Sequence, residues 1–161
     1  MIAEYAHYLH HEPVIVPDSY LPPPVLTYSQ QRRKWILENT YLYQGDGFTL
    51  TVPAGYAFDL ASVPRAVWWA IAPFELSIVA PLVHDFLYDY GGELPAPAVY
   101  PYRVFTRRQA DYLFLEIMRR EGVAELKARI AFNAVRAAGW IGWKGRGEPD
   151  DENSLLFMPL S

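Results

Sequence analysis

VAPLVHDFLYDYGG, residues 79–92, is the stretch of sequence that decides the fold. Its apolar residues recur three and four positions apart, which is the spacing of one face of an α-helix. The Gly91-Gly92 pair ends the pattern, because glycine readily takes the left-handed conformation that terminates helices. Pro81 either sits in the first turn or kinks the helix. The stretch predicts an amphipathic helix whose apolar stripe comprises Val79, Leu82, Val83, Phe86, Leu87 and Tyr90.

Three polar side chains interrupt this apolar helix. His84 and Tyr88 are four residues apart and therefore share a face, and Asp85 lies about 100° further round and flanks them. A single histidine in a helix is more often a structural residue than a catalytic one. A functional interpretation of His84 therefore needs a partner from elsewhere in the chain.

A second amphipathic helix is predicted from Arg107 to Glu121. Thr106 has the residue type of an N-cap, and Gln109, three residues later, completes the pattern of a capping box. Gly122 ends the helix. Both ends of this helix are therefore marked in the sequence.

Asp111 stands at the head of the apolar stripe of this second helix. A charged carboxylate in such a place costs several kcal/mol unless it is paired. We predict that an antiparallel pair of helices brings His84 to Asp111, directly or through one water, with Tyr88 close by. The other candidate partners are Arg65, Arg107 and Arg108.

The residues before these helices alternate in the manner of β-strands. The runs 34–43 and 47–52, joined by Gly45-Asp46-Gly47, predict a hairpin, and 56–58 predicts a short third strand. Pro64 can open a short helix that extends to Ala70. The sequence therefore predicts an α+β fold, in which a small antiparallel β-sheet is followed by three or four packed helices.

The last helix is expected from about Val123 to Ile141, with one apolar stripe. That stripe comprises Leu126, Ile130, Ala134, Ala137 and Ile141. This helix completes a single α+β body over residues 31–144.

Extended arms are expected on both sides of this body. Residues 1–30 form a proline-rich N-terminal arm, because the run LPPPV at 21–25 favours a polyproline-like conformation. Residues 145–161 form an acidic linker that ends in an apolar plug. Neither segment can build a core of its own.

Composition excludes several classes of protein. The chain has 161 residues, no cysteine and a net charge of −4 with scattered basic residues. Disulfides and thiolate metal sites are therefore excluded, and nucleic acid is not expected as a partner. No apolar run approaches the roughly 20 residues of a transmembrane helix. We expect synthesis in a host cytoplasm.

The turn FDLASVPR, residues 58–65, is a third polar element. Asp59 or Ser62 could cap the helix that begins at Pro64. Asp59 could instead bind a cation or pair with Arg65. The residues themselves leave these alternatives open.

Three motifs follow one another in the chain. They are Asp-x-Ala-Ser-x-Pro-Arg in VPAGYAFDLASVPR (52–65), His-Asp-x-Leu-Tyr in LVHDFLYDY (82–90) and Arg-x-x-Ala-Asp in TRRQADYLFLEIMRREGV (106–123). The ordered set, over about residues 47–142, resembles the domain of unknown function 1353 family of bacteriophages and prophages. The resemblance implies a phage or prophage origin and brings no established activity with it.

The second motif, with Asp111 on a later helix, is also similar to the arrangement in secreted calcium-dependent phospholipases. That similarity implies a catalytic set of His84 as base and Asp111 as its orienting carboxylate, with Tyr88 beside them. It also implies Asp85 as a calcium ligand. The sequence departs from the pattern, because it lacks disulfides and a glycine-rich calcium loop, and only Asp59 could replace the missing ligands. Calcium is expected only if the protein is such a hydrolase, and otherwise no cofactor is expected.

Two functions remain in competition. We predict a bacteriophage virion component, tail-associated, that uses the polar cluster to hold its helices together. The alternative is a phage-encoded hydrolase that acts on ester bonds of a membrane or envelope. The expected partners are other phage structural proteins or copies of this chain, bound through residues 17–26 and 154–160, because the first is pre-extended and the second is apolar. A structural component would be located in the virion.

Overall fold

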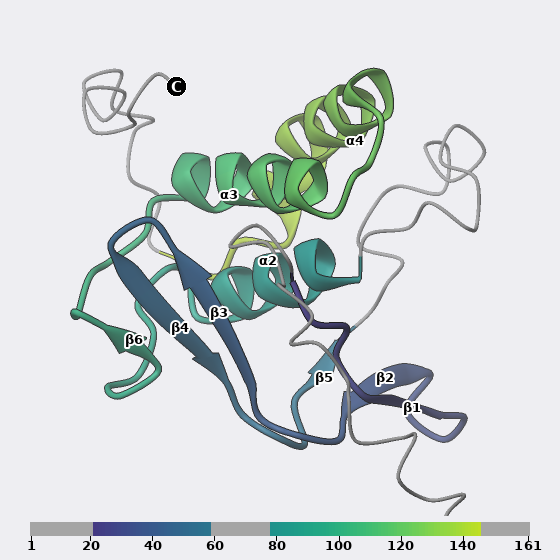
Figure 1. Ribbon diagram of the computed structural model, residues 1–161, viewed down its shortest axis with the longest axis vertical. Helices are drawn as coiled ribbons and strands as arrows, with labels where there is room; N and C mark the ends of the chain where they lie inside the picture. Colours follow the sequence, from purple (N-terminus) through teal and green to yellow (C-terminus); the bar gives the residue numbers. More distant parts are fainter. Residues whose placement is uncertain (1–20, 59–77, 146–161) are drawn as a thin grey trace, which may run out of the picture.

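The computed structural model describes residues 21–58 and 78–145, which hold six strands, three α-helices and one 3-10 helix (Figure 1). The strands are β1 (Leu26–Ser29), β2 (Lys34–Leu37), β3 (Tyr41–Gly45), β4 (Phe48–Val52), β5 (Ala57–Phe58) and β6 (Val99–Tyr100). The helices are α2 (Val79–Asp89), α3 (Arg107–Arg120), α4 (Glu125–Ala138) and the 3-10 helix η3 (Gly139–Ile141). The predicted α+β class is confirmed.

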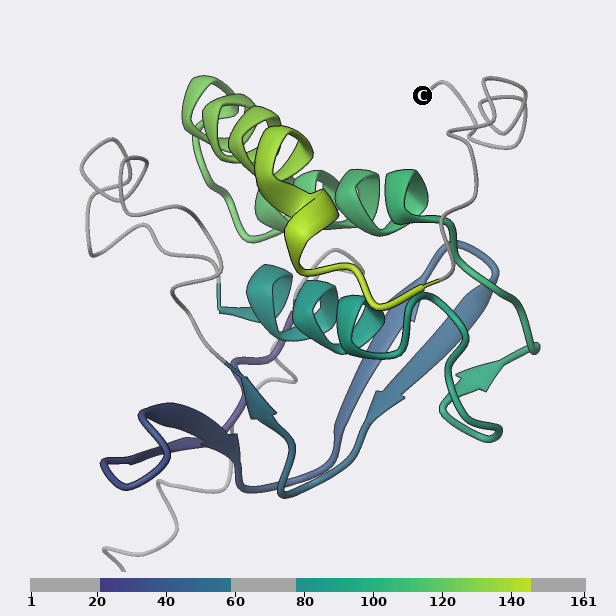
Figure 2. The same ribbon diagram turned by 180° about the vertical axis from the view of Figure 1, so that it is seen from behind.

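The strands form two antiparallel sheets of three strands each, in the orders β1-β2-β5 and β3-β4-β6. The expected hairpin joins β3 to β4, with Gly45 opposite Phe48 and Gly47 at a φ of 68°. Figure 1 and Figure 2 show α2 between the strands on one side and α3 on the other. Helix α3 also reaches β3 directly, because Arg120 Nη1 donates to Tyr43 Oη at 3.0 Å and to Gln44 O at 2.8 Å.

The prediction of one continuous strand over 34–43 was wrong. The run divides into β2 and β3, which belong to different sheets. The cause is three consecutive exposed residues, Glu38 to Thr40, which interrupt the alternation. The end of β2 is held by the turn before β5, since Gly55 N–H donates to Leu37 O at 2.7 Å.

Helix α2 follows its sequence pattern closely. Pro81 lies in the first turn, and Gly91 and Gly92 take φ values of 57° and 79° just after the helix. The apolar stripe is buried, except that Tyr90, at the C-terminal end, is 45% exposed. The polar cluster therefore stands on a helix that is otherwise enclosed by the core.

Helix α3 runs alongside α2 and is fixed at both ends. The predicted capping box is present, because Thr106 Oγ1 accepts from Gln109 N–H and Gln109 Oε1 accepts from Thr106 N–H. Just after the helix, Glu121 Oε1 accepts from Ile78 N–H at 3.3 Å and Val79 N–H at 3.2 Å. Since α2 has no side-chain cap of its own, this carboxylate also sets the register between the two helices.

The predicted inner stripe of α4 was wrong except at Ala134, which is partly buried against the core. Leu126 and Ile141 are each 72% exposed and Ile130 is 38% exposed. The buried residues are instead Ala128, Ala131 and Val135. The small side chains of Ala128 and Ala131 allow α4 to approach its neighbours closely, and Leu126 and Ile130 remain outside. This rotation of α4 decides which of its polar residues reaches the core.

The end of the predicted N-terminal arm packs against the body. Leu21 contacts the core, Tyr41 Oη donates to Pro22 O at 2.8 Å, and residues from Leu26 onward form β1. The sheet thus includes residues before 31, the predicted start of the body. Residues 1–20 and 146–161 and the expected helix over 64–70 lie outside the described residues. Among the described helices, none has both the length and the apolar character that a membrane crossing requires.

Candidate functional site

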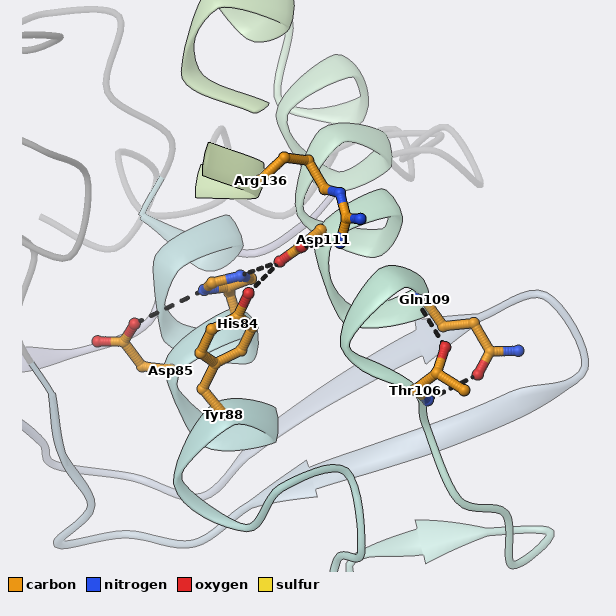
Figure 3. A network of polar contacts seen from close by, with 7 residues as sticks. All are labelled: His84, Asp85, Tyr88, Thr106, Gln109, Asp111 and Arg136. Carbon is orange, nitrogen blue, oxygen red and sulfur yellow. Dashed lines mark hydrogen bonds and ion pairs between the residues drawn. The ribbon is translucent and has the colours of Figure 1, made fainter. Parts of the chain in front are cut away.

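Asp111 is the centre of a buried cluster between α2 and α3 (Figure 3). Its Oδ1 atom lies 2.9 Å from His84 Nε2 and 2.5 Å from the Tyr88 hydroxyl. Asp111 has no exposed surface, and His84 is only 5% exposed. The expected contact between His84 and Asp111, with Tyr88 close by, is therefore present.

Arg136 is the member of this cluster that the sequence analysis missed. Its Nη1 atom lies 2.8 Å from Asp111 Oδ2, so both carboxylate oxygens are occupied. Arg136 follows Val135, the last buried residue of α4, and the rotation of that helix brings it to the core. The signal in the sequence was the run Ala128, Ala131 and Val135, whose spacing marks the inner face of α4.

The contacts of Asp111 fix the tautomer of neutral His84. An ionised carboxylate only accepts hydrogen bonds, so the Nε2 atom that faces it must carry the hydrogen. The lone pair of the neutral ring is then on Nδ1. This nitrogen faces Asp85, whose Oδ1 atom is 3.8 Å away and therefore beyond hydrogen-bond distance. His84 can consequently accept a proton only on the side of Asp85.

Charge and burial shift the pKa of His84 in opposite directions. Burial lowers the pKa of the imidazole, because the charged form loses its hydration, whereas the carboxylates of Asp111 and Asp85 raise it. The carboxylates prevail, and the pKa of His84 is raised above its usual value of 6.5. The protonated ring is thus stabilised between two acids.

The hydrogen-bond donors around Asp111 lower the pKa of its carboxyl group. Burial alone would raise the pKa of this carboxyl, but the hydrogen bonds from His84, Tyr88 and Arg136 hold the pKa below the usual value of 3.8. Burial and the Asp111 carboxylate also raise the pKa of the Tyr88 hydroxyl, so this group remains a donor. The cluster therefore contains an ionised acid with three donors.

Aromatic rings hold the cluster in place. The His84 ring lies 4.0 Å from the Tyr88 ring and 5.1 Å from the Phe114 ring, measured between centroids. Trp143, after η3, meets Tyr88 edge to face at 5.0 Å. Tyr88 is therefore enclosed between its own helix and the segment that follows α4.

Asp89 links the cluster to the sheet and to the C-terminal end of the described chain. Its Oδ2 atom accepts from the Tyr56 hydroxyl at 2.8 Å, and its Oδ1 atom lies 2.5 Å from Lys144 Nζ. The backbone N–H of Lys144 also donates to Tyr88 O at 3.2 Å. These contacts hold residues 143–145 across the end of α2.

A cavity of about 230 Å³ opens beside the cluster. Its described lining includes Lys34, Phe58, His84, Asp85, Tyr88 and Val135. The lining combines apolar side chains with the imidazole of His84 and the carboxyl group of Asp85. Nε2 of His84 is bound to the fully buried Asp111, and Nδ1 faces Asp85, which also lines this cavity. The cavity can hold a small molecule or one end of a larger one.

The described residues fit a calcium ion poorly. Calcium takes six to eight oxygen ligands, and the described part of the chain contains no group of three acidic or imidazole side chains that could hold a metal. Asp85 borders the cavity, whereas the neighbouring Asp89 is bound to Tyr56 and Lys144. Asp59, the second expected ligand, lies outside the described residues, as do Ser62 and Arg65.

Comparison with protein families gives one match. The family model described as "Protein of unknown function (DUF1353)" matches residues 35–135, which is more than half of the chain. The chain belongs to this family. The matched region of this DUF1353 protein contains His84, Asp85, Tyr88 and Asp111 and ends just before Arg136.

No curated protein and no solved structure matches this DUF1353 chain. Family membership therefore assigns a relationship and no chemistry. The similarity to secreted calcium-dependent phospholipases remains an expectation from the sequence motif. The chemistry has to be argued from the cluster and the cavity themselves.

Proposed function

We propose that this DUF1353 protein is a hydrolase of ester bonds in which His84 is the general base. The observation that supports the proposal is the division of labour between the two ring nitrogens. Nε2 is bound to Asp111 at 2.9 Å, which leaves Nδ1 as the acceptor of a neutral ring that borders the cavity. A base needs this combination of a fixed tautomer and an accessible lone pair.

The proposed reaction begins with a water molecule between Nδ1 of His84 and the ester carbonyl. The water oxygen forms a bond to the carbonyl carbon while one of its protons moves to Nδ1. The bond from that carbon to the alcohol oxygen then breaks, and His84 returns the proton to the leaving oxygen. The products are a carboxylic acid and an alcohol, and His84 is neutral again.

Asp111 stabilises the imidazolium that forms during this reaction. Its position against Nε2 orients the ring, and its negative charge offsets the positive charge of the protonated ring. Tyr88 and Arg136 hold the carboxylate from two further directions. Together with His84, these two residues limit the movement of Asp111 while the charge on the imidazole changes.

The cavity sets the size and character of the substrate. Its volume of about 230 Å³ is below the roughly 300–1,000 Å³ of pockets for drug-sized ligands. Phe58 and Val135 offer an apolar wall for an acyl group, and Lys34 is the permanent cation in the described lining. The Lys34 ammonium is our candidate for stabilising the oxyanion of the tetrahedral intermediate.

Turnover of esters by purified protein tests the proposal. The substrates are short-chain carboxylic esters and phospholipid vesicles, and the variant is His84→Gln. We expect the variant to remain folded, with lower stability because its contact with Asp111 is weakened, and to lose at least about 100-fold in kcat/KM, which is the scale of general-base catalysis. The exposed Asp46→Asn variant is the control for mutation elsewhere and should retain activity. Wild-type protein without activity on any of these esters would contradict the proposal.

A structural role in a bacteriophage particle is the second candidate. Exposed apolar side chains favour it, because Leu126 on α4, Ile141 on η3 and Tyr100 on β6 each expose most of their surface. Such side chains suit contacts with other tail proteins or with copies of this chain. In both cases His84→Gln should lower stability; in this alternative it should also lower assembly, whereas in a hydrolase the variant should assemble normally and lose turnover.

A further inference from the structure

Gly139, where α4 passes into η3, has no backbone reason to be glycine. Its φ and ψ are −62° and −24°, which are ordinary right-handed helical values. Any L-residue adopts this conformation, and glycine in a helix costs about 0.5–1 kcal/mol relative to alanine. The reason for glycine must therefore lie in what surrounds the Cα atom.

The space beside Gly139 is occupied by the Tyr88 hydroxyl. A Cβ atom built on Gly139 would lie 2.3 Å from Tyr88 Oη and 3.2 Å from Cζ, which is far inside van der Waals contact. This hydroxyl is the group that donates to Asp111. Its ring is confined by His84 on one side and by Trp143 on the other, so it has little freedom to move aside.

We propose that Gly139 is a positioning residue for the polar cluster, because its missing side chain lets the Tyr88 hydroxyl share Asp111 Oδ1 with His84. Only the consequence for turnover rests on the hydrolase function proposed above. The geometric statement concerns four residues: Gly139 lies against the Tyr88 hydroxyl, and this hydroxyl and His84 both contact Asp111 Oδ1. The C-terminal end of α4 then influences the cluster at two points, Arg136 and Gly139.

The displaced hydroxyl should change the proton affinity of His84. Tyr88 donates to Asp111 Oδ1, which disperses part of the carboxylate charge. Without this donor, more of that charge acts on the imidazolium, and the pKa of His84 rises. Gly139→Ala should therefore shift His84 in the same direction as Tyr88→Phe.

Gly142 provides a matched control three residues away. Its φ and ψ are −93° and −14°, so it too has no left-handed backbone, and an added Cβ would meet Tyr88 Cδ1 at 3.5 Å, an ordinary contact. Both alanine variants thus add the same methyl group beside the same ring. They differ in whether that group collides with the hydroxyl.

The experiment is an NMR titration of the His84 ring in full-length protein, with the signal assigned by its absence in His84→Gln. Gly139→Ala should raise the pKa of His84 by about half a unit or more, and Gly142→Ala should leave it at the wild-type value. In a Tyr88→Phe background, Gly139→Ala should cause little further shift, because the colliding oxygen is absent. An unchanged pKa in Gly139→Ala, or an equal shift in both backgrounds, overturns the proposal.

Thermal unfolding gives a second reading if Gly139→Ala folds poorly. Tyr88→Phe should then restore much of the lost stability, because the remaining contact to Cζ at 3.2 Å needs only a small adjustment. Equal destabilisation in both backgrounds overturns the proposal in this case too. Because these readings need no substrate, the inference can stand if the protein proves inactive on esters, and it can fail in an active enzyme.

Discussion

Replacing Asp111 by asparagine should be among the most damaging isosteric changes in this protein. Asp111 is completely buried, and the three groups that face it, from His84, Tyr88 and Arg136, all donate. Asparagine presents one acceptor oxygen and one donating amide. At least one of the three donors then meets another donor.

The size of the loss follows from these contacts. Breaking a buried ion pair costs about 3–5 kcal/mol, and a hydrogen bond to a charged group contributes about 1.5–3 kcal/mol. Arg136 is 24% exposed, so water can compensate its charge in part and the loss belongs at the lower end. We expect about 3 kcal/mol at pH 7, or a fall in Tm of about 10 °C for a domain of this size.

Urea unfolding at pH 7 measures this loss, with the exposed Asp46→Asn as the matched control. The control should stay within about 0.5 kcal/mol of wild type, as surface substitutions usually do. The pKa of His84 should also fall below 6.5 in Asp111→Asn, because burial lowers it and the main opposing carboxylate is gone. A loss under about 1 kcal/mol with the pKa of His84 still raised would refute the central role of Asp111.

Four further predictions concern the fold and the ligands. The free energy of unfolding should be highest between about pH 4 and 6.5, measured by urea titration at a series of pH values. The raised pKa of His84 gives stability below 6.5 that is lost as pH rises through the folded value, and the lowered pKa of Asp111 gives stability above 3.8 that is lost as pH falls. Glu121→Ala should lower the free energy of unfolding by about 1 kcal/mol, measured by thermal unfolding. Glu121→Gln should lower it less, since glutamine keeps an acceptor for the first N–H groups of α2. If both variants are as stable as wild type, Glu121 does not cap α2. If calcium binds at Asp85, calorimetry should show binding that Asp85→Asn abolishes, and EDTA should stop ester turnover; wild-type protein without binding heat excludes this version of the hydrolase. Deleting residues 154–161 should leave the thermal transition nearly unchanged and abolish incorporation into a particle or oligomer, and an unfolded truncated protein would show instead that the segment belongs to the core.

The cluster could be predicted because its members break strong local patterns. Asp111 stands on an apolar stripe, and burial of an unpaired charge is too costly to tolerate. His84 was the only histidine between the predicted arms. The helix signals at Thr106 and Gly91 were equally local, and the structure contains both. Patterns of this kind depend on neighbours within one or two turns and can be read without knowing the fold.

The errors arose where local patterns were ambiguous. Helix α4 has two apolar stripes, and the one that contains Leu126 and Ile130 was predicted to face the core. Close packing instead favours the stripe of Ala128 and Ala131, because small side chains bring the helix axes together. Which stripe wins depends on the shape of α3, which the sequence of α4 does not contain. Arg136 was missed for the same reason, since its direction follows from the rotation of α4.

The protonation state of His84 that stabilises the fold is not the one that the proposed chemistry needs. Asp111 and Asp85 favour the protonated form of His84. The fold is therefore more stable with the protonated ring than with the neutral one. A general base, however, must be neutral before it takes a proton from water. Raising the pH through the pKa of His84 should therefore increase ester turnover while it decreases the free energy of unfolding. A structural component should assemble best at the pH at which its fold is most stable. Assembly that peaks at this pH therefore supports the structural role. Turnover that rises as stability falls supports the base.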